Sequence, residues 1–500
     1  MRISNKLILF LAVLLLYSCA LTKKHYSPNT KYPRAQLQKD YGLLRKILQK
    51  THPSLYWYTG KDSMDRYFDF YYAAIEDSMT EQQFGWKILA PLTEKIRCGH
   101  TSFGMSKSYN RWANNKRFAA FPLLLKCWND SLAVVANLNR KDTIFKRGAL
   151  VTSINGLQNK ELIHTLFGYM TKDGNADNVN YMRLSNNFSY YHRNIMGLSK
   201  RYEVQYIDVR GNTITAMLPL FEFPKDSSQK VRATDTKKVK GRERRLQRLE
   251  ETRSMAVDTL NNTAVITLNT FSTGGLRRFF RRSFRYIRKM GISNMVLDIR
   301  SNGGGRINLS TLLTRYVTRI PFKVADTAFA AVRSLGPYTK YIKGRLINNI
   351  GLFFLTRKRE DGKYHFGLWE RKLYKPKKLN HYGGDLYVLT NGLTFSASAL
   401  FCNAVKGQPG IKLVGEETGG GWYGNNGILI PEIILPETHL RVRLPLFRLV
   451  QYKHVKKDGH GVMPDIYIGT NYEALVKGFD KKMQVVMDLI KEKNRIVNKQ

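Results

Sequence analysis

Residues 295–305 read Met-Val-Leu-Asp-Ile-Arg-Ser-Asn-Gly-Gly-Gly, and this stretch decides the fold class of the chain. The run from Met295 to Ile299 is almost continuously apolar, which is typical of a strand that is covered on both faces. Three glycines follow closely, and glycine lets the backbone turn sharply and present its N–H groups to a ligand. No Lys-Ser/Thr pair follows the glycines, so we do not expect a nucleotide-binding P-loop. The stretch predicts a buried strand that ends at a functional loop.

Strands and helices alternate on both sides of this stretch. The predicted elements are, in chain order, a strand at Ala264–Leu268, a helix at Leu276–Lys289, a strand at Leu386–Leu389, a helix at Ser396–Val405 and a strand at Lys412–Gly415. The first of these helices carries apolar side chains on one face and arginines on the other, as a helix packed on a sheet does. This alternation predicts a layered α/β domain.

The 500 residues of the chain are more than one hydrophobic core usually supports, so several units are expected. Apolar residues at three- and four-residue steps predict helices that end at Thr51-His52-Pro53 and at Cys98-Gly99. Short apolar runs between turns predict a β module, with a hairpin turn at Asn155-Gly156. The expected units are a leader at 1–18, a tether at 19–34, a helical domain at 35–120, the β module at 121–220, a basic linker at 221–255, an α/β domain at 256–480 and a C-terminal helix or tail at 481–500.

The N-terminus has the pattern of an export signal. Met1–Lys6 carries two positive charges, and an apolar run, too short for a comfortable membrane span, follows at Leu7–Leu16. Cys19 then stands at the expected cleavage point, in an order of residues that resembles a bacterial lipobox. The resemblance implies that Cys19 is lipidated; the alternative is an ordinary signal peptide with a chance cysteine. We therefore expect an exported protein, periplasmic or at the cell surface, anchored to a bacterial membrane.

The composition is strongly basic, since 82 Lys and Arg against 38 Asp and Glu give a net charge of +44. Such a charge fits a nucleic acid or an anionic membrane as partner, and it also fits a soluble protein with lysine-rich faces. No homeodomain, zinc-finger or RNA-motif signature accompanies it, so nucleic acid is not expected. After Cys19 only Cys98, Cys127 and Cys402 remain. These three are too few for a disulfide framework. They also lack CxxC spacing, so no metal site is expected.

Ser396 is the first candidate catalytic residue. It lies in Thr390–Ala399, which reads Thr-Asn-Gly-Leu-Thr-Phe-Ser-Ala-Ser-Ala, between a predicted strand and a predicted helix. A serine in that place exposes its Oγ beside the backbone N–H groups of a helix start, which can stabilise an oxyanion. The alternative interpretation is that Ser396 only caps the helix.

His100 and Asp458 are the other two candidates. A serine nucleophile needs a base, and histidine titrates near neutrality, so His100 in Arg97-Cys98-Gly99-His100 is a natural choice. Asp458 lies in a glycine-rich turn and could orient the imidazole and stabilise its charged form. Taken alone, His100 is more readily interpreted as a hydrogen-bonded structural histidine, and Asp458 as part of a turn that leads into a final strand.

Four segments taken together resemble a known family. They are the glycine stretch at 297–305, Ser396-Ala397-Ser398, Val414-Gly415-Glu416-Glu417-Thr418-Gly419-Gly420, and Gly461-Val462-Met463-Pro464-Asp465. They occur in this order in the C-terminal processing and tricorn-core serine peptidases, and the resemblance covers about residues 260–470. It implies a crotonase-like ββα peptidase domain, and the segment around Asn155-Gly156 resembles part of a PDZ domain.

The resemblance also indicates which branch of the family applies. One branch uses a lysine base 25 residues after the serine, a position that Gly421 occupies here. The histidine-containing branch fits better, with His100 as base and Asp458 where glutamate is common. Two departures bear on efficiency, because aspartate is one methylene shorter and Gly99 replaces a supporting serine of the tricorn core.

Three functions remain open from the sequence. The first is a serine endopeptidase that cleaves peptides or unfolded proteins by acyl transfer to Ser396, without a cofactor, and with an oxyanion hole from the N–H groups of Gly303–Gly304 and Ala397. The second is a pseudo-peptidase, a lipid-tethered peptide-binding module. The third is a basic protein that binds nucleic acid or anionic membrane. The sequence leaves the substrate and the oligomeric state undefined.

Overall fold

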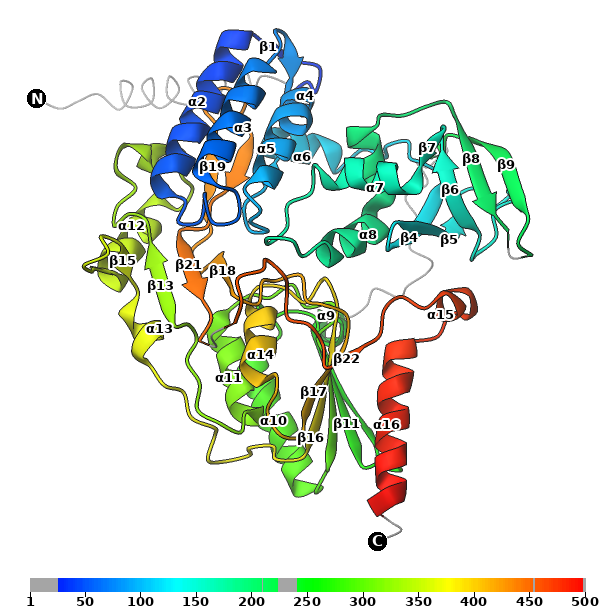
Figure 1. Cartoon of the computed structure of the whole chain (residues 1–500), viewed down its shortest axis with the longest axis vertical. Coiled ribbons are helices and arrows are strands. Elements are labelled where there is room, and N and C mark those ends of the chain that lie inside the picture. Colours follow the sequence, from blue (N-terminus) through cyan, green and yellow to red (C-terminus); the bar gives the residue numbers. More distant parts are fainter. Residues whose placement is uncertain (1–25, 209, 224–240, 453–454, 498–500) are drawn as a thin grey trace, which may run out of the picture.

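The computed structural model describes residues 26–208, 210–223, 241–452 and 455–497 (Figure 1). The expected leader, the lipid attachment at Cys19 and residues 224–240 of the basic linker lie outside these ranges. The first described part of the chain is helical, as predicted. It consists of α2 (Arg34–Thr51), α3 (Lys61–Ala73) and a composite helix of α4 (Glu81–Gln83), the π-helical η1 (Phe84–Leu89) and α5 (Ala90–Lys95), with the strand pair β1 (Lys31–Tyr32) and β2 (Met79–Thr80).

The π-helical turn in the composite helix has a local cause. Pro91 has no N–H to donate to the carbonyl four residues earlier, and its ring crowds that carbonyl. The helix widens just before this proline, so that the N–H of Ala90 donates to the carbonyl of Gly85, five residues back. The apolar stripe of Phe84, Ile88 and Leu92 stays buried through the widened turn, and the helix ends just before Cys98, as the periodicity predicts.

The N-terminal helices do not have a core of their own. Leu44, Phe68 and Leu92 belong to the same buried cluster as Phe447 and Leu449, which come from the other end of the chain. Two small sheets contribute to this shared cluster. The first has the order β14 (Arg357–Lys358), β15 (Tyr364–His365), β13 (Thr327–Ala330), β21 (Phe447–Val450) and β18 (Gly424–Gly427). The second has the order β19 (Glu432–Ile434), β20 (Arg441–Arg443) and β3 (Phe103–Gly104). Because β3 pairs with β20, the segment just after His100 is hydrogen-bonded to a strand that lies more than 300 residues further along the chain.

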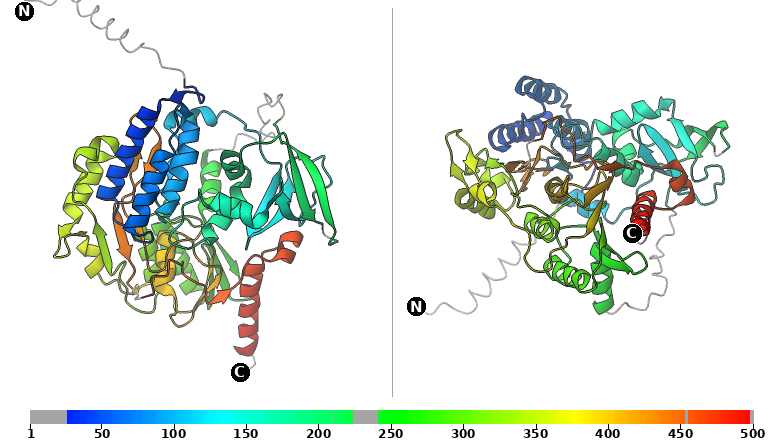
Figure 2. Two further views of the ribbon diagram at one scale, coloured as in Figure 1. Left: turned by 45° about the horizontal axis from the view of Figure 1, so that its top comes forward. Right: turned by 60° about the horizontal axis from the view of Figure 1, so that its bottom comes forward.

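The β module forms a separate body beside the helices (Figure 2). Its strands follow the order β4 (Leu123–Trp128), β5 (Ser131–Asn137), β6 (Leu150–Ile154), β8 (Arg201–Ile207) and β9 (Thr213–Pro219), with β7 (Leu157–Gln158) on β6 and the helices α7 (Asn159–Phe167) and α8 (Asn178–Ile195). The predicted hairpin turn is present between β6 and β7. Both of its residues adopt positive φ, 51° at Asn155 and 77° at Gly156, the conformation that a tight hairpin requires.

The third body is the layered α/β domain that the alternation of elements predicts. Its sheet has the order β10 (Arg253–Asp258), β11 (Thr263–Leu268), β12 (Asn294–Asp298), β16 (Asp385–Thr390), β17 (Ile411–Gly415) and β22 (Ile466–Tyr467), and all neighbours except β10 and β11 are parallel. One face is covered by α10 (Leu276–Lys289), α11 (Ile307–Val317) and α14 (Ala397–Val405), and the other by α16 (Lys481–Val497). Helices on both faces explain why residues 295–297 at the centre of β12 are all apolar.

Six further short elements complete the described fold. They are α6 (Lys107–Ala113), α9 (Gly241–Thr252), η2 (Gly336–Tyr341), α12 (Arg345–Leu355), α13 (Gly367–Arg371) and α15 (Tyr472–Lys477). No helix within the described ranges is both long and apolar enough to cross a bilayer. The three cysteines in the described part of the chain are buried and unpaired, and no metal-binding cluster of His, Cys, Asp and Glu occurs there.

Candidate active site

The parallel sheet brings two predicted functional loops together. Parallel strands end at the same edge, so the loops after β12 and β16 are neighbours. The N–H of Phe395 donates to the carbonyl of Asn302 at 3.2 Å, which joins the loop before Ser396 to the glycine loop. Built onto Gly304, a Cβ atom would lie 2.7 Å from the Cβ of Ser396. Only glycine therefore allows the two loops to approach this closely.

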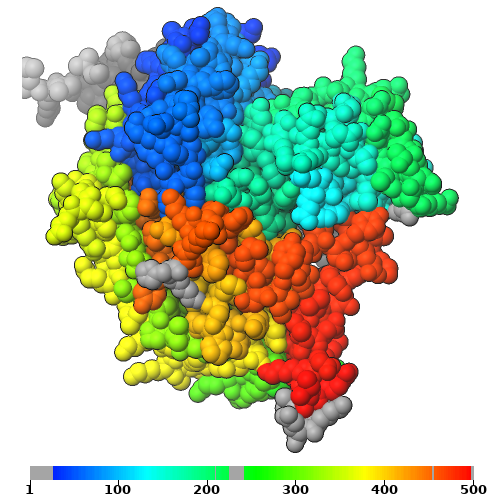
Figure 3. Space-filling view, in the orientation of Figure 1, coloured from blue at the N-terminus to red at the C-terminus, as the bar shows by residue number. Residues whose placement is uncertain are grey.

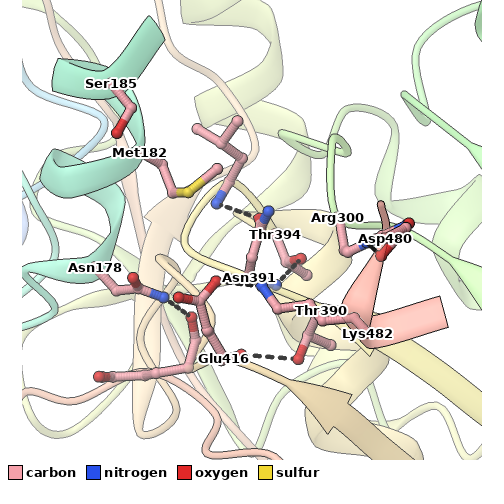
Figure 4. Close-up of polar contacts among 12 residues, drawn as sticks. Asn178, Met182, Ser185, Arg300, Thr390, Asn391, Thr394, Glu416, Asp480 and Lys482 are labelled. Carbon is pink, nitrogen blue, oxygen red and sulfur yellow. Dashed lines mark hydrogen bonds and ion pairs between the residues drawn. The ribbon is translucent and has the colours of Figure 1, made fainter. Parts of the chain in front are cut away.

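Polar contacts fix the loop that leads to Ser396 (Figure 4). Thr390 Oγ1 donates to the carbonyl of Glu416 at 2.8 Å, and the N–H of Asn391 donates to Thr394 Oγ1 at 3.2 Å. Asn178 of α8 donates its side-chain N–H to the carbonyl of the residue after Glu416, at 2.7 Å. The β module thus helps to hold the loop in which Ser396 lies.

Ser396 has an unusual backbone conformation and does not cap its helix. It stands at the N-terminal boundary of α14 with φ 54° and ψ −121°, and its side chain makes no capping hydrogen bond. Positive φ is strained for a residue other than glycine, and such strain concentrates at functional sites. The turn directs Oγ to within 3.1 Å of Nε2 of His100, so the hydroxyl can donate to the ring nitrogen. The prediction that residues 100 and 396 converge is confirmed.

His100 is held in a dry environment. Its side chain is buried, and the ring of Phe395 lies against it with the centroids 4.8 Å apart. Burial lowers the pKa of His100 to about 3, and the positive charges of Arg443 and Arg183 add to the effect. The imidazole is therefore neutral near pH 7, which is the form that can accept the proton of Ser396.

Asp458 does not occupy the position that the sequence analysis assigns to it. Its carboxylate accepts the N–H of His460 at 2.9 Å, in a turn at the exposed surface. Nδ1 of His100 is buried and has no hydrogen-bond partner among the described residues. The assignment of Asp458 as the acid on His100 is thus not met in this structure, because the short side chain closes its own turn instead of reaching the imidazole.

A buried aspartate that the sequence analysis missed lies closer to the histidine. Asp173, in the loop between α7 and α8, accepts the N–H of Gly99 at 2.7 Å and that of Gly421 at 3.5 Å. Burial raises the pKa of Asp173 to about 6, although these N–H groups oppose the shift. Its loop also contacts the Asp458 turn, since the N–H of Asn175 donates to the carbonyl of Gly459 at 2.7 Å. Its only sequence signal is a polar, turn-rich run between two helices.

The proposed oxyanion donors also need one correction. The N–H of Gly304 donates to Oδ1 of Asn302 at 3.0 Å, so it is engaged within its own loop. The N–H groups of Gly303 and Ala397 make no hydrogen bond within the described residues. These two groups are the better candidates for stabilising a developing oxyanion.

The departures from the family pattern have structural reasons. A Cβ at Gly99 would lie 2.7 Å from the ring of Phe395, and one at Gly421 would lie 2.5 Å from the carbonyl oxygen of Gly424. A serine at position 99 would therefore clash with the aromatic ring that packs on His100. A lysine at position 421 has no room, which agrees with the choice of the histidine branch.

A cavity of about 540 Å³ opens over the Ser396–His100 pair. The glycine loop, Leu393 and Ile430 form parts of its wall, and Arg183 and Arg443 line it as well. Both arginines and Gly99 also line an adjoining cavity of about 240 Å³, whose other walls include the aromatic rings of Trp86, Phe103 and Tyr190. Neither arginine forms an ion pair within the described ranges. The site thus combines a candidate nucleophile, a neutral imidazole that is the candidate base, candidate oxyanion donors and two arginines.

This fold and this site define a serine-type peptidase. Residues 262–468 match the model of peptidase family S41. Residues 262–468 are therefore an S41 peptidase domain, and the chain is a serine-type peptidase, a hydrolase.

Solved structures share the overall fold. Mature CPAF complexed with lactacystin has a TM-score of 0.63 at 12% identity, with 93% of this chain and 99% of that chain covered. Mature CPAF alone gives 0.62 at 14% identity, with 92% and 98% covered, and a serine-to-alanine mutant of CPAF gives 0.60 at 11%, with 89% and 94% covered. At these identities the likeness shows the fold only. No significant match to the chain was found among curated proteins.

Proposed function

We propose that the chain is a serine endopeptidase that hydrolyses peptide bonds by acyl transfer to Ser396. The observation that carries the proposal is the 3.1 Å approach of His100 Nε2 to Ser396 Oγ. In the proposed reaction, Oγ attacks the substrate carbonyl carbon while His100 takes the hydroxyl proton. The N–H groups of Gly303 and Ala397 stabilise the oxyanion. His100 then gives its proton to the departing amine, and water releases the acyl group by the same steps.

A covalent fluorophosphonate probe tests the nucleophile. The wild-type protein should be labelled, whereas Ser396→Ala and His100→Ala should not. His192→Gln is the matched control, because His192 is also buried, lies in the β module and lines no part of the catalytic cavity. Labelling of Ser396→Ala at the wild-type rate would refute the assignment of the nucleophile.

A pseudo-peptidase is the second candidate, and one observation favours it. His100 lacks an acid partner at Nδ1 among the described residues, and an imidazole without an orienting acid is a weaker catalyst. In that case the wild-type protein would stay unlabelled by the probe and would still bind peptides. Peptide binding measured on Ser396→Ala separates this outcome from a misfolded protein.

Arg183 and Arg443 favour substrates that are cut near their C-termini. Both cations face the cavity beside Ser396, and arginine pairs well with a carboxylate. Peptides of identical sequence with a free and with an amidated C-terminus should differ in KM by about tenfold, the free form being better. Arg443→Gln should remove the difference. If a glutamate side chain replaces the free terminus equally well, the arginines read an acidic residue instead.

The proposed place of action is outside the cytoplasm, with the chain anchored to a bacterial membrane through Cys19. The proposal rests on the order of basic, apolar and small residues before that cysteine. The substrates would then be exported peptides or unfolded proteins. Replacement of Cys19 by serine should move most of the protein from the membrane fraction to the soluble fraction.

A further inference from the structure

Helix α12 presents its apolar side to solvent. Leu346, Ile347, Ile350, Phe353 and Phe354 have exposed fractions of 72%, 73%, 57%, 50% and 69%. They are separated by steps of one, three and four residues, so they lie on one face of the helix. A surface helix usually buries this face, and clustered exposure of large apolar side chains marks an interaction site.

The opposite side of α12 is the side that packs on the protein. Asn348 and Leu352 are buried, and a Cβ built on Gly351 would lie 3.1 Å from the side chain of Leu429. The helix is therefore docked firmly, and its exposed face is not the result of a detached segment. It lies at the outer edge of the molecule (Figures 1 and 3).

Cations frame this apolar face at both ends. The basic residues within 340–363 are Lys340, Lys343, Arg345, Arg357, Lys358, Arg359 and Lys363, against the two acids Glu360 and Asp361. Three of them are neutralised, because Lys343, Arg359 and Lys363 form ion pairs. Arg345, Arg357 and Lys358 are exposed and form no ion pair with any residue that the structure describes.

We propose that α12 is an interfacial helix that docks the protein on an anionic lipid surface. An apolar face flanked by basic residues is the pattern of helices that lie in the headgroup region of a bilayer. With 11 residues the helix is about 16 Å long, far less than a bilayer core, so it lies along the surface. The proposal does not depend on peptidase activity or on lipidation of Cys19.

Charge favours the lipid over a second copy of the chain. A two-fold contact through α12 would bring two sets of unpaired cations together in a protein that already carries a net charge of +44. Anionic headgroups instead neutralise those cations. Docking would also set the catalytic cavity near the membrane, since Leu429, which contacts α12, precedes the cavity residue Ile430.

A fluorescent label tests the docking site directly. Phe354→Cys is labelled with an environment-sensitive NBD dye in a full-length Cys19→Ser background, where the described cysteines are buried and the expected lipid anchor is absent. Vesicles of phosphatidylcholine and phosphatidylglycerol, mixed at about 7:3, should raise the emission roughly threefold, as expected when a side chain enters the headgroup region. The control label stands at Phe70→Cys on α3, where the side chain is equally exposed at 64%, and its emission should not change.

Charge reversal tests the electrostatic part. The three substitutions Arg345→Glu, Arg357→Glu and Lys358→Glu together should weaken binding to anionic vesicles by about tenfold or more. The unsubstituted protein should bind vesicles without anionic lipid more weakly by a similar factor. Three results would overturn the proposal. They are an unchanged signal at position 354 with anionic vesicles, an equal rise at position 70, and a rise at 354 that depends on protein concentration without vesicles, which would indicate a second copy.

Discussion

The Ser396–His100 pair and the Asp458 turn were expected to form one catalytic unit, and they differ in how the fold holds them. The pair is enclosed by the glycine loop, by Phe395 and by a loop of the β module. The Asp458 side chain is exposed and closes only its own turn. A side chain that several elements enclose has one available orientation, whereas an exposed one is set by its nearest hydrogen bond. Convergence in space therefore follows from packing and not from the presence of the right residue type.

The largest expected effect comes from breaking the pair. Ser396→Ala or His100→Ala should lower kcat by about 10⁴- to 10⁶-fold, and the double variant should be no worse than either single one, because the two residues act as a unit. Steady-state hydrolysis of a fluorogenic peptide measures the loss. Additive losses in the double variant would show that His100 does not serve Ser396.

The next effect concerns the aspartate beside the pair. Asp173→Ala leaves the N–H of Gly99 without an acceptor and should let the His100 segment shift, with a loss in kcat of about 10- to 100-fold. Asp173→Asn keeps an acceptor oxygen and should retain most of the activity.

The split between kcat and KM identifies the role of Asp173. A positioning role lowers kcat with little change in KM, whereas general damage to the fold also lowers the amount of active enzyme found by titration with the probe. Equal losses in the alanine and asparagine variants would mean that the negative charge of Asp173 matters more than its hydrogen bond.

How much the sequence predicts depends on whether the signal is local. The helix at 276–289 and the strand at 294–298 follow from periodicity, and Ser396 and His100 follow from an ordered set of motifs. Asp173 has no such signal, because its importance arises only when the β module folds against Gly99. The same holds for the shared core, since no pattern in residues 35–95 shows that Phe447 completes it.

The glycine loop shows that the sequence does not predict which individual backbone N–H groups stay free. The triplet predicts a loop with available N–H groups, and this is confirmed for Gly303. The sequence could not tell that Asn302 would take the N–H of Gly304. That bond depends on a side-chain rotamer inside a buried loop, which only the three-dimensional packing determines.

Three buried histidines, of which only His100 lies in the site, should also make stability sensitive to acid. Burial lowers the pKa of His52 and His100 to about 3 and that of His192 to about 4, from 6.5. Each of these histidines gains its proton on unfolding, so the free energy of unfolding is full above about pH 6.5 and falls as the pH drops toward 4. Asp173 acts in the opposite direction, because its raised pKa of about 6 means that stability is lost as the pH rises from 3.8 to 6. Burial also raises the pKa of Asp40, so two aspartates act against the three histidines.

Thermal denaturation between pH 7 and pH 4 measures this dependence. His192→Gln should reduce by about one the number of protons that are taken up on unfolding. The melting temperature of this variant should therefore fall less steeply between pH 6.5 and pH 4, and the variant leaves Ser396 and His100 unchanged. A melting temperature that stays constant down to about pH 4.5 would contradict the neutral, buried state of these imidazoles.

The smallest expected effect on kcat comes from a substitution at the exposed Asp458. Asp458→Asn can still accept the N–H of His460, and it should change kcat by less than about threefold if the carboxylate never reaches His100. The loss expected from an acid in contact with the histidine is about 10⁴-fold, so kcat separates the two arrangements clearly. A loss of about 100-fold or more, with probe labelling of Ser396 slowed in parallel, would mean that substrate binding turns Asp458 toward Nδ1. The histidine-containing triad would then assemble only in the complex, which is consistent with an imidazole nitrogen that is buried and unpaired among the described residues.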